Sequence, residues 1–173
     1  MTTQLKKQMT TFLTKEDIAE LVSQLAKEIQ MDYEGKEVIF ICPLRGSIHF
    51  VADLMRELEL PQQVDFVHVQ AVERGGAIKI VKDISTNIAG KHVLIIEEII
   101  DTGRTLSFLR SRLFASAPAS LKIVTLLDKP ARRELPIKAD YIGKTIDDRY
   151  VVGYGMDSEE VGRNYSDIYT MKN

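Results

Sequence analysis

Three short, largely apolar runs constrain the fold of this chain more than any other feature. They are VIFIC at residues 38–42, VLII at 93–96 and LKIVTLL at 121–127. Runs of this length without polar alternation are typical of strands that are covered on both faces, as in a parallel sheet. Such strands need long crossover connections, because parallel neighbours cannot be joined by a tight turn.

Helical spacing of apolar residues occurs between these runs. Thr14 and Asp17 have the form of a helix N-cap, and apolar residues then recur at helical spacing from Ile18 to Ile29. Similar patterns run from Phe50 to Leu58 and from Leu106 to Leu113. Strands that alternate with helices predict an α/β fold, with a parallel twisted sheet and helices on both faces.

Other segments alternate apolar and polar residues, which is typical of half-exposed strands. VDFVHVQ (64–70) and AIKIVK (77–82) are of this kind, and AVERGG between them would close a hairpin at about 64–82. ADYIG, YVVGYG and DIYTMK are short strand candidates towards the C-terminus. No repeat or linker divides the sequence, so residues 1–173 are predicted to form a single domain.

Charge and composition argue against several classes of function. With 23 basic and 25 acidic residues the net charge is -2, so we do not expect a nucleic acid partner. No apolar run approaches membrane-spanning length, and the first residues lack the apolar core of a signal peptide. We therefore expect a cytoplasmic protein without a membrane partner. Cys42 is the single cysteine and is predicted to be a buried thiol.

The stretch VLIIEEIIDTGRTL at 93–106 carries the clearest sign of chemistry. Glu97, Glu98 and Asp101 lie close together, and their repulsion is unfavourable unless a cation or hydrogen-bond donors lie among them. Residues 102–105 then supply hydroxyls and backbone N–H groups at the start of a predicted helix, a place where phosphate binds. Carboxylates beside a phosphate site suit a sugar phosphate, because its hydroxyls can donate to them.

Two other strand ends carry unusual residues. PLRGS (43–47) follows the first apolar run, and DKPARR (128–133) follows the third. Open parallel sheets bind ligands beyond the carboxyl ends of their strands, and these three ends meet at one edge. The predicted fold and the predicted chemistry therefore point to the same place.

The stretch EEIIDTGRT resembles the signature of the purine phosphoribosyltransferases, specifically the hypoxanthine-guanine type. CPLRGS resembles their pyrophosphate-binding loop, LLDKP the strand end with their base-recognising lysine, and DDRYVVGYGMD their purine-stacking and metal-binding segment. The resemblance covers roughly residues 38–172. It implies a type I phosphoribosyltransferase-like fold with a flap hairpin. A small C-terminal hood would form from the N-terminal segment and the C-terminal strands.

The resemblance also implies a reaction. The 5-phosphoribosyl group of phosphoribosyl pyrophosphate (PRPP) would pass to a 6-oxopurine, hypoxanthine or guanine, giving IMP or GMP and pyrophosphate in purine salvage. Positive charge develops on the sugar and negative charge on the leaving pyrophosphate, so both must be stabilised. Mg²⁺ is the implied cofactor, because it shares its coordination shell with phosphates and water.

Roles for individual residues follow from the same resemblance. Asp101 would handle the proton of the purine. Glu97 and Glu98 would hold the ribose hydroxyls, directly or through the metal, and Asp157 would be a further metal ligand. The 5'-phosphate would bind to Thr102, Gly103, Arg104 and Thr105.

The leaving group and the base are assigned to other segments. Lys129 would donate to the 6-oxo group, Tyr150 would stack on the purine, and Val151 would offer it backbone groups. Taken alone, Lys129 would be a solvated charge and Tyr150 a partly buried strand residue. The family often has a cis peptide at the position of Leu44–Arg45. Pyrophosphate would bind to Leu44, Arg45, Gly46, Ser47 and Arg163.

The chain departs from the family pattern at several positions. Glu98 stands where Asp is usual, Arg45 where Lys is common and Ser47 where Gly is common. The flap is shorter, and its adjacent Ser-Tyr pair is replaced by residues such as Ala71 and Val72. Because a lid excludes water from the reacting groups, a reduced lid could slow turnover, abolish it, or leave closure to residues 73–74.

Two further hypotheses compete with an active enzyme. The missing Ser-Tyr pair suggests a nucleotide-binding or PRPP-binding regulator of the same fold, although Asp101 and Lys129 would have little use there. A phosphorylated receiver-type domain would need paired acids after the first apolar run, and there are none. The family resemblance further implies a homodimer or homotetramer.

Overall fold

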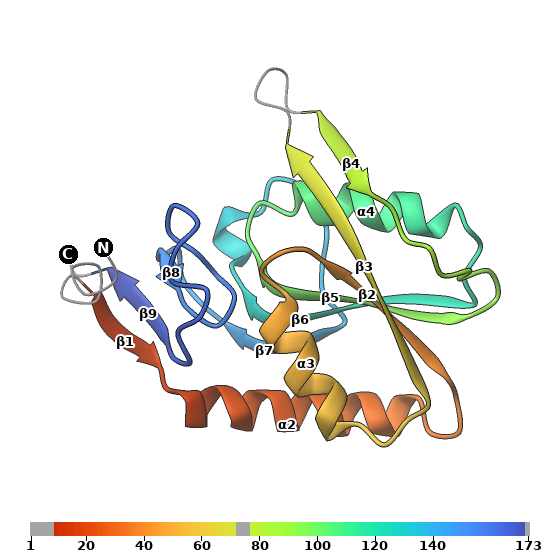
Figure 1. Cartoon of the computed structure of the whole chain (residues 1–173), viewed down its shortest axis with the longest axis horizontal. Coiled ribbons are helices and arrows are strands. Elements are labelled where there is room, and N and C mark those ends of the chain that lie inside the picture. Colours follow the sequence, from red (N-terminus) through yellow and green to blue (C-terminus); the bar gives the residue numbers. More distant parts are fainter. Residues whose placement is uncertain (1–8, 72–76, 172–173) are drawn as a thin grey trace.

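The structure is a computed structural model, and it describes residues 9–71 and 77–171. The main sheet consists of β2 (Val38–Pro43), β3 (Gln62–Ala71), β4 (Ile78–Lys82), β5 (His92–Ile100), β6 (Ser120–Asp128) and β7 (Tyr141–Thr145). Its order is β4-β3-β2-β5-β6-β7 (Figure 1). The pairs from β3 to β7 are parallel, and β4 pairs with β3 in the antiparallel direction.

Helices cover both faces of this sheet, as predicted. They are α2 (Lys15–Asp32), α3 (Ile48–Glu57) and α4 (Arg104–Phe114), with a short 3₁₀ turn, η1, at Pro130–Arg132. The apolar sides of α2 and α3 share one buried cluster with the sheet, while α4 belongs to the cluster on the opposite face. Figure 1 shows α2 and α3 along one side of the sheet and α4 along the other. The α/β fold is thereby confirmed.

The first helix begins where the sequence predicts. The Thr14 hydroxyl accepts from the backbone N–H of Asp17 at 3.1 Å, and the Asp17 carboxylate accepts from the N–H of Thr14 at 2.8 Å. This capping box satisfies backbone donors that the helix cannot satisfy internally. The N-terminus of α2 is therefore closed by its own side chains.

Strand β5 is longer than predicted. The apolar run at 93–96 suggests a strand that ends before the acids, but the ladder to β6 continues through Glu97, Ile99 and Ile100. Glu97 and Glu98 thus lie inside a strand rather than in the turn after it. The continuous pairing on the β6 side outweighs the unfavourable placement of two carboxylates in the sheet.

A second, smaller sheet lies beside the first. It pairs β1 (Met9–Leu13) with β9 (Ile168–Met171), and β9 with β8 (Val151–Val152), all antiparallel. Figure 1 shows β1 and β9 side by side in this sheet, which thus joins the first and last described strands of the sequence. No helix in residues 9–71 and 77–171 is long and apolar enough to cross a membrane.

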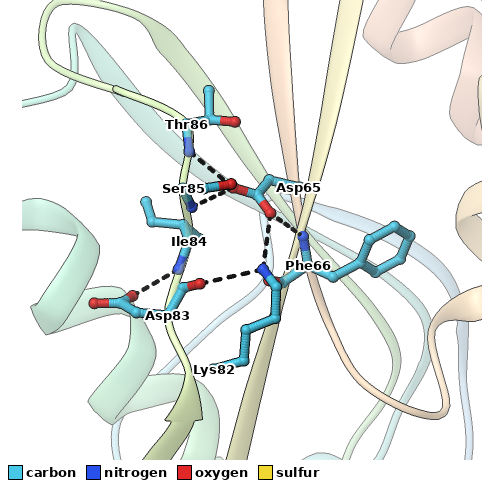
Figure 2. A network of polar contacts seen from close by, with 7 residues as sticks. All are labelled: Asp65, Phe66, Lys82, Asp83, Ile84, Ser85 and Thr86. Carbon is cyan, nitrogen blue, oxygen red and sulfur yellow. Dashed lines mark hydrogen bonds and ion pairs between the residues drawn. The ribbon is translucent and has the colours of Figure 1, made fainter.

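Strands β3 and β4 form the predicted hairpin, with Gln70 opposite Lys79 and Ala71 opposite Ile78. Residues 72–74, which include part of the replaced flap pair and the suggested substitute for closure, lie outside the described residues. The base of the hairpin is well defined. It is anchored to the segment before β5 through the carboxylate of Asp65, as Figure 2 shows.

The Asp65 carboxylate collects an unusual number of donors for a buried acid. It accepts from the N–H groups of Ser85 at 2.6 Å, Thr86 at 2.9 Å and Phe66 at 2.7 Å, and from the Lys82 ammonium at 3.1 Å. Burial by itself raises the pKa of Asp65, but these donors outweigh it and hold the pKa well below its ordinary value of 3.8. The ionised carboxylate therefore fixes β3, β4 and the following loop together.

We expect Asp65→Asn to lower the free energy of unfolding by about 2 kcal/mol near neutral pH, because it weakens a buried, charge-assisted network. The folded-state pKa lies below the unfolded one, so this stabilisation is present above pH 3.8 and fades as the pH falls through the folded value. Denaturant unfolding at several pH values should show the gap between wild type and variant closing in acid.

Asp83→Asn is the matched control, since Asp83 makes a part-exposed pair with Arg112. It should cost less than about 1 kcal/mol at any pH. An equal loss in both variants, or a gap that widens in acid, would contradict the role given to Asp65.

Candidate active site

One pocket lies where the carboxyl ends of β2 and β5 meet the start of α4. Its walls come from the three segments that the sequence singles out after the first two apolar runs and near the C-terminus. Most of the predicted ligand-binding residues line it: Leu44, Arg45, Gly46, Glu97, Glu98, Asp101, Thr102, Gly103, Arg104, Thr105 and Arg163. The structure therefore brings together residues that are up to 119 positions apart in the sequence, from Leu44 to Arg163.

The turn at the start of α4 is open to an anion. Within the described chain, the N–H groups of Thr102, Gly103 and Thr105 donate to no protein oxygen, and that of Arg104 reaches only the Thr102 hydroxyl at 3.4 Å. Helix α4 has no side-chain cap and no acid in its first turn, in contrast to the capped α2. Unsatisfied donors and the positive end of a helix dipole together form a phosphate site.

Gly103 gives this turn its shape. Its φ of 80° lies in the left-handed region, which glycine adopts at little cost. A Cβ at this position would lie 2.5 Å from Cγ2 of Ile137, so there is also no room for a side chain. The turn at residues 102–105, called the phosphate turn below, therefore packs closely against the segment that follows β6.

Two adjacent carboxylates lie beside this turn in β5. Glu97 is 9% exposed, and burial followed by the neighbouring Glu98 raises its pKa well above the ordinary value. Burial likewise raises the pKa of Glu98 to about 7, although Arg163 acts in the opposite direction. Both shifts show that the protein alone does not compensate these charges, so a cation or hydroxyl donors would be favoured here.

The donor set is compatible with magnesium, which prefers hard oxygen ligands and binds through one or two carboxylates together with substrate oxygens. In the described part of the chain, however, no three His, Cys, Asp or Glu side chains converge to hold a metal ion. The expected set of Glu97, Glu98 and Asp157 is therefore not preassembled. Asp157 instead pairs with Arg163 at 2.7 Å.

The predicted pyrophosphate loop is packed closely between two other segments. The Leu44–Arg45 peptide is cis, as the family resemblance implies. A Cβ on Gly46 would lie 1.8 Å from Oε1 of Glu98, and a Cβ on Gly155 would lie 1.9 Å from the carbonyl oxygen of Gly46. Glycines at 46 and 155 thus allow β5, the loop and the C-terminal segment to meet.

Charged contacts connect the same segments. Glu160 accepts from Arg45 at 2.5 Å and lies 3.6 Å from Arg163, which also donates to the Gly155 carbonyl at 2.8 Å. The side chain of Ser47 is fully buried, and its hydroxyl donates to the Pro43 carbonyl at 2.5 Å. A pyrophosphate contact from Ser47 would therefore involve its backbone.

The residues expected to recognise the base follow β6 and precede β8. Lys129 is 6% exposed, so the alternative of a solvated charge is wrong, and its ammonium makes no hydrogen bond or ion pair with the described residues. Tyr150 is 54% exposed and donates to the Asp157 carbonyl at 3.1 Å, so it is not a buried strand residue. Val151 is buried at the start of β8.

Residue-by-residue reasoning missed several contacts around Asp101. Its carboxylate accepts from Nε of Arg132 at 3.0 Å, and its carbonyl accepts from Arg133. Glu134 contacts the phosphate turn through its backbone N–H, which donates to the Thr102 carbonyl at 3.0 Å. A signal is present in the sequence, since DKPARR places two arginines directly after a buried strand, but the sequence does not say what they bind.

An α/β sheet whose central strand ends in a turn with free N–H groups, beside carboxylates, has the features of a sugar-phosphate site. Comparison with known proteins specifies the class: the family model for the phosphoribosyl transferase domain matches residues 8–159. This chain belongs to that family.

Individual members of the family are similar to this chain over most of its length. A hypoxanthine-guanine phosphoribosyltransferase of Staphylococcus aureus strain N315 is 42% identical over 164 residues, which is 92% of each chain. The crystal structure of a hypoxanthine-guanine phosphoribosyltransferase from Bacillus anthracis is 41% identical, with a TM-score of 0.90 over 95% of this chain and 97% of that one. A hypoxanthine phosphoribosyltransferase from Trypanosoma cruzi, bound to its product IMP, is 36% identical with a TM-score of 0.90, covering 94% and 93%.

The close packing at Gly46 can be tested with Gly155→Ala. The new Cβ would enter a left-handed position and collide with the Gly46 carbonyl, so we expect a loss of about 3 kcal/mol in the free energy of unfolding. The displaced loop should also bind pyrophosphate at least about tenfold more weakly by calorimetry.

Gly35→Ala provides the comparison, because Gly35 has a φ of 71° and no atom lies within 4 Å of the place that its new methyl group would take. It should cost only the backbone term, about 1–2 kcal/mol, and leave pyrophosphate affinity unchanged. Equal effects of the two substitutions on pyrophosphate affinity would refute the contact.

Proposed function

We propose that this chain transfers the 5-phosphoribosyl group from PRPP to a 6-oxopurine, hypoxanthine or guanine, with release of pyrophosphate. The observation that carries the proposal is the uncapped N-terminus of α4 in one pocket with the buried carboxylate of Glu97 and the half-buried carboxylate of Glu98. The names of the relatives agree with it. A phosphate would accept hydrogen bonds from the free N–H groups at the start of α4. The hydroxyls of a sugar would donate hydrogen bonds to Glu97 and Glu98.

The reaction is a substitution at C1' of the ribose. A bond forms from an imidazole nitrogen of the purine to C1', while the C1'–oxygen bond breaks and its electron pair leaves with pyrophosphate. The proton of that nitrogen passes to the Asp101 carboxylate. Positive charge on the sugar is stabilised by nearby carboxylates, and negative charge on the leaving group by cationic side chains.

Each part of the pocket has a task in this step. The free N–H groups of residues 102–105 hold the 5'-phosphate and so fix the sugar. Glu97 and Glu98 hold the ribose hydroxyls, either by accepting hydrogen bonds from them or through the metal. The loop at residues 44–47 receives pyrophosphate with Arg163, which lines the same pocket. Fixing both ends of PRPP converts the attack into a nearly unimolecular step.

Magnesium is proposed as the cofactor, bound by the β5 carboxylates and by oxygens of PRPP, with Asp157 as a further candidate ligand. When bound, it would neutralise negative charge on the departing pyrophosphate. The carboxylates Glu97 and Glu98 are suited to it because burial disfavours their charged forms without a cation. The ion pair of Asp157 with Arg163 must open if Asp157 takes part.

Base recognition is assigned to the segments after β6 and before β8. The buried ammonium of Lys129 makes no hydrogen bond or ion pair in the described chain and is suited to a 6-oxo acceptor. It would meet the 6-amino group of adenine as one donor facing another, which is unfavourable. Tyr150 is exposed enough to offer its ring to the purine, and Val151 would contribute backbone groups.

The relatives reported above carry the names of enzymes, and no observation favours a regulator that has lost turnover. A homodimer or homotetramer and a cytoplasmic location remain predictions. So does the consequence of the shorter flap, whose central residues lie outside the described part of the chain.

A purine panel with Asp101→Asn tests the central assignment. Pyrophosphate release by wild type should occur with hypoxanthine or guanine and not with adenine. In the variant it should fall by a factor on the order of 10²–10⁴, because an amide cannot accept the proton. Calorimetry should show PRPP binding largely retained. Wild type that folds and binds PRPP but turns over no purine would defeat the proposed function.

Removal of the metal gives a second test. Excess chelator should abolish turnover, and added magnesium should restore it, while thermal unfolding of the unliganded protein changes little. PRPP affinity measured with and without magnesium should be higher with it, because the ion would offset the negative charges of PRPP and of Glu97 and Glu98. Full turnover in the presence of chelator would remove magnesium from the mechanism.

A further inference from the structure

The carboxylate of Asp101 is held by a neighbouring arginine. Nε of Arg132 donates to Oδ1 of Asp101 at 3.0 Å. Within residues 9–71 and 77–171, Arg132 is the side chain that hydrogen-bonds this carboxylate, so Oδ2 remains available to a ligand. Arg132 also lies 3.7 Å from Oδ1 of Asp148, which anchors the guanidinium from the side of the Tyr150 segment.

The two residues after Arg132 hold the backbone of the same turn. Arg133 donates to the Asp101 carbonyl and to the carboxylate of Asp128, in a pair whose side chains are only 13% and 11% exposed. The N–H of Glu134 donates to the Thr102 carbonyl at 3.0 Å. Arg133 and Glu134 therefore hold the backbone at Asp101 and Thr102, and Arg132 holds the side chain of Asp101.

The Arg132–Asp101 pair contributes little to stability. The two side chains are 47% and 44% exposed, and exposed ion pairs contribute about 0–1 kcal/mol. The guanidinium instead fixes the orientation of the carboxylate, because it is planar and permanently charged and its N–H groups donate in fixed directions. Arg132 ends η1, which starts after Lys129, so one short turn places both the base-contacting lysine and this arginine.

We propose that Arg132 is a positioning residue that orients the Asp101 carboxylate towards the purine for proton transfer. This inference rests on the proposed function and adds a residue to it. Oδ1 is held by Arg132, and Oδ2 faces the proton that leaves the purine. Without the arginine the carboxylate rotates among several orientations, and fewer encounters with bound purine are productive.

The test compares wild type, Arg132→Gln, Asp101→Asn and the double variant. Arg132→Gln should lower kcat on the order of 10- to 100-fold, as expected for a misplaced reacting group, with the KM for PRPP changed less than about threefold. In the Asp101→Asn background the same substitution should have little further effect, because the group that it orients is already inactive. Single-turnover measurements keep the slow variants measurable.

Arg112→Gln is the matched control. Arg112 also pairs with an aspartate through its guanidinium, at 2.7 Å from Asp83, but Asp83 does not line the pocket, whereas Asp101 does. Its kcat should equal that of wild type. Melting temperatures of both arginine variants should stay close to wild type, which separates positioning from unfolding.

The outcomes separate the two proposals. Wild-type kcat in Arg132→Gln, or a full-sized loss that persists in the Asp101→Asn background, overturns the positioning role while the proposed function stands. Absence of turnover by wild type overturns the proposed function itself. Loss of kcat in Arg132→Gln that disappears in the double variant supports the inference.

Discussion

The parallel pairing of β5 between β2 and β6 is the constraint on which the site depends. Ile95 pairs with Ile41 on one side, and Ile100 pairs with Asp128 on the other. This register brings the loop after β2, the phosphate turn after β5 and Lys129 after β6 to the same edge. The N–H of Lys129 continues the ladder by donating to the Ile100 carbonyl at 3.0 Å. Every charged group in the pocket is placed relative to this central strand.

Much of this arrangement could be predicted because it depends on local chemistry. Continuous apolar runs mark the buried strands, since both faces of a parallel sheet are covered. The capping box at Thr14 marks a helix start, because its donors and acceptors lie within four residues of the sequence. The turn at residues 102–105 is also indicated in the sequence, because hydroxyls and a glycine stand directly before a helical pattern.

The remainder depends on contacts between distant segments. Sequence patterning underestimates the length of β5, because its acids tolerate burial only through the neighbouring strands. The sequence also does not show that the Ser47 hydroxyl donates to the carbonyl of Pro43. Arg132 and Arg133 could be recognised as unusual, but their partner Asp101 lies 31 and 32 positions earlier in the chain. Apolar patterning indicates which elements form, and only the folded chain shows which charges meet.

The contact between Gly46 and Glu98 has a consequence for how sequences of this kind can vary. The longer acid at position 98 extends its carboxylate into the space that a side chain at position 46 would occupy. A side chain at position 46 would therefore require the Glu98 carboxylate to move, whereas a shorter aspartate at position 98 would reach less far into that space. Gly155, on the other side of the same loop, is the stricter position, because its φ is positive and a Cβ there would meet the backbone carbonyl of Gly46, which cannot rotate away.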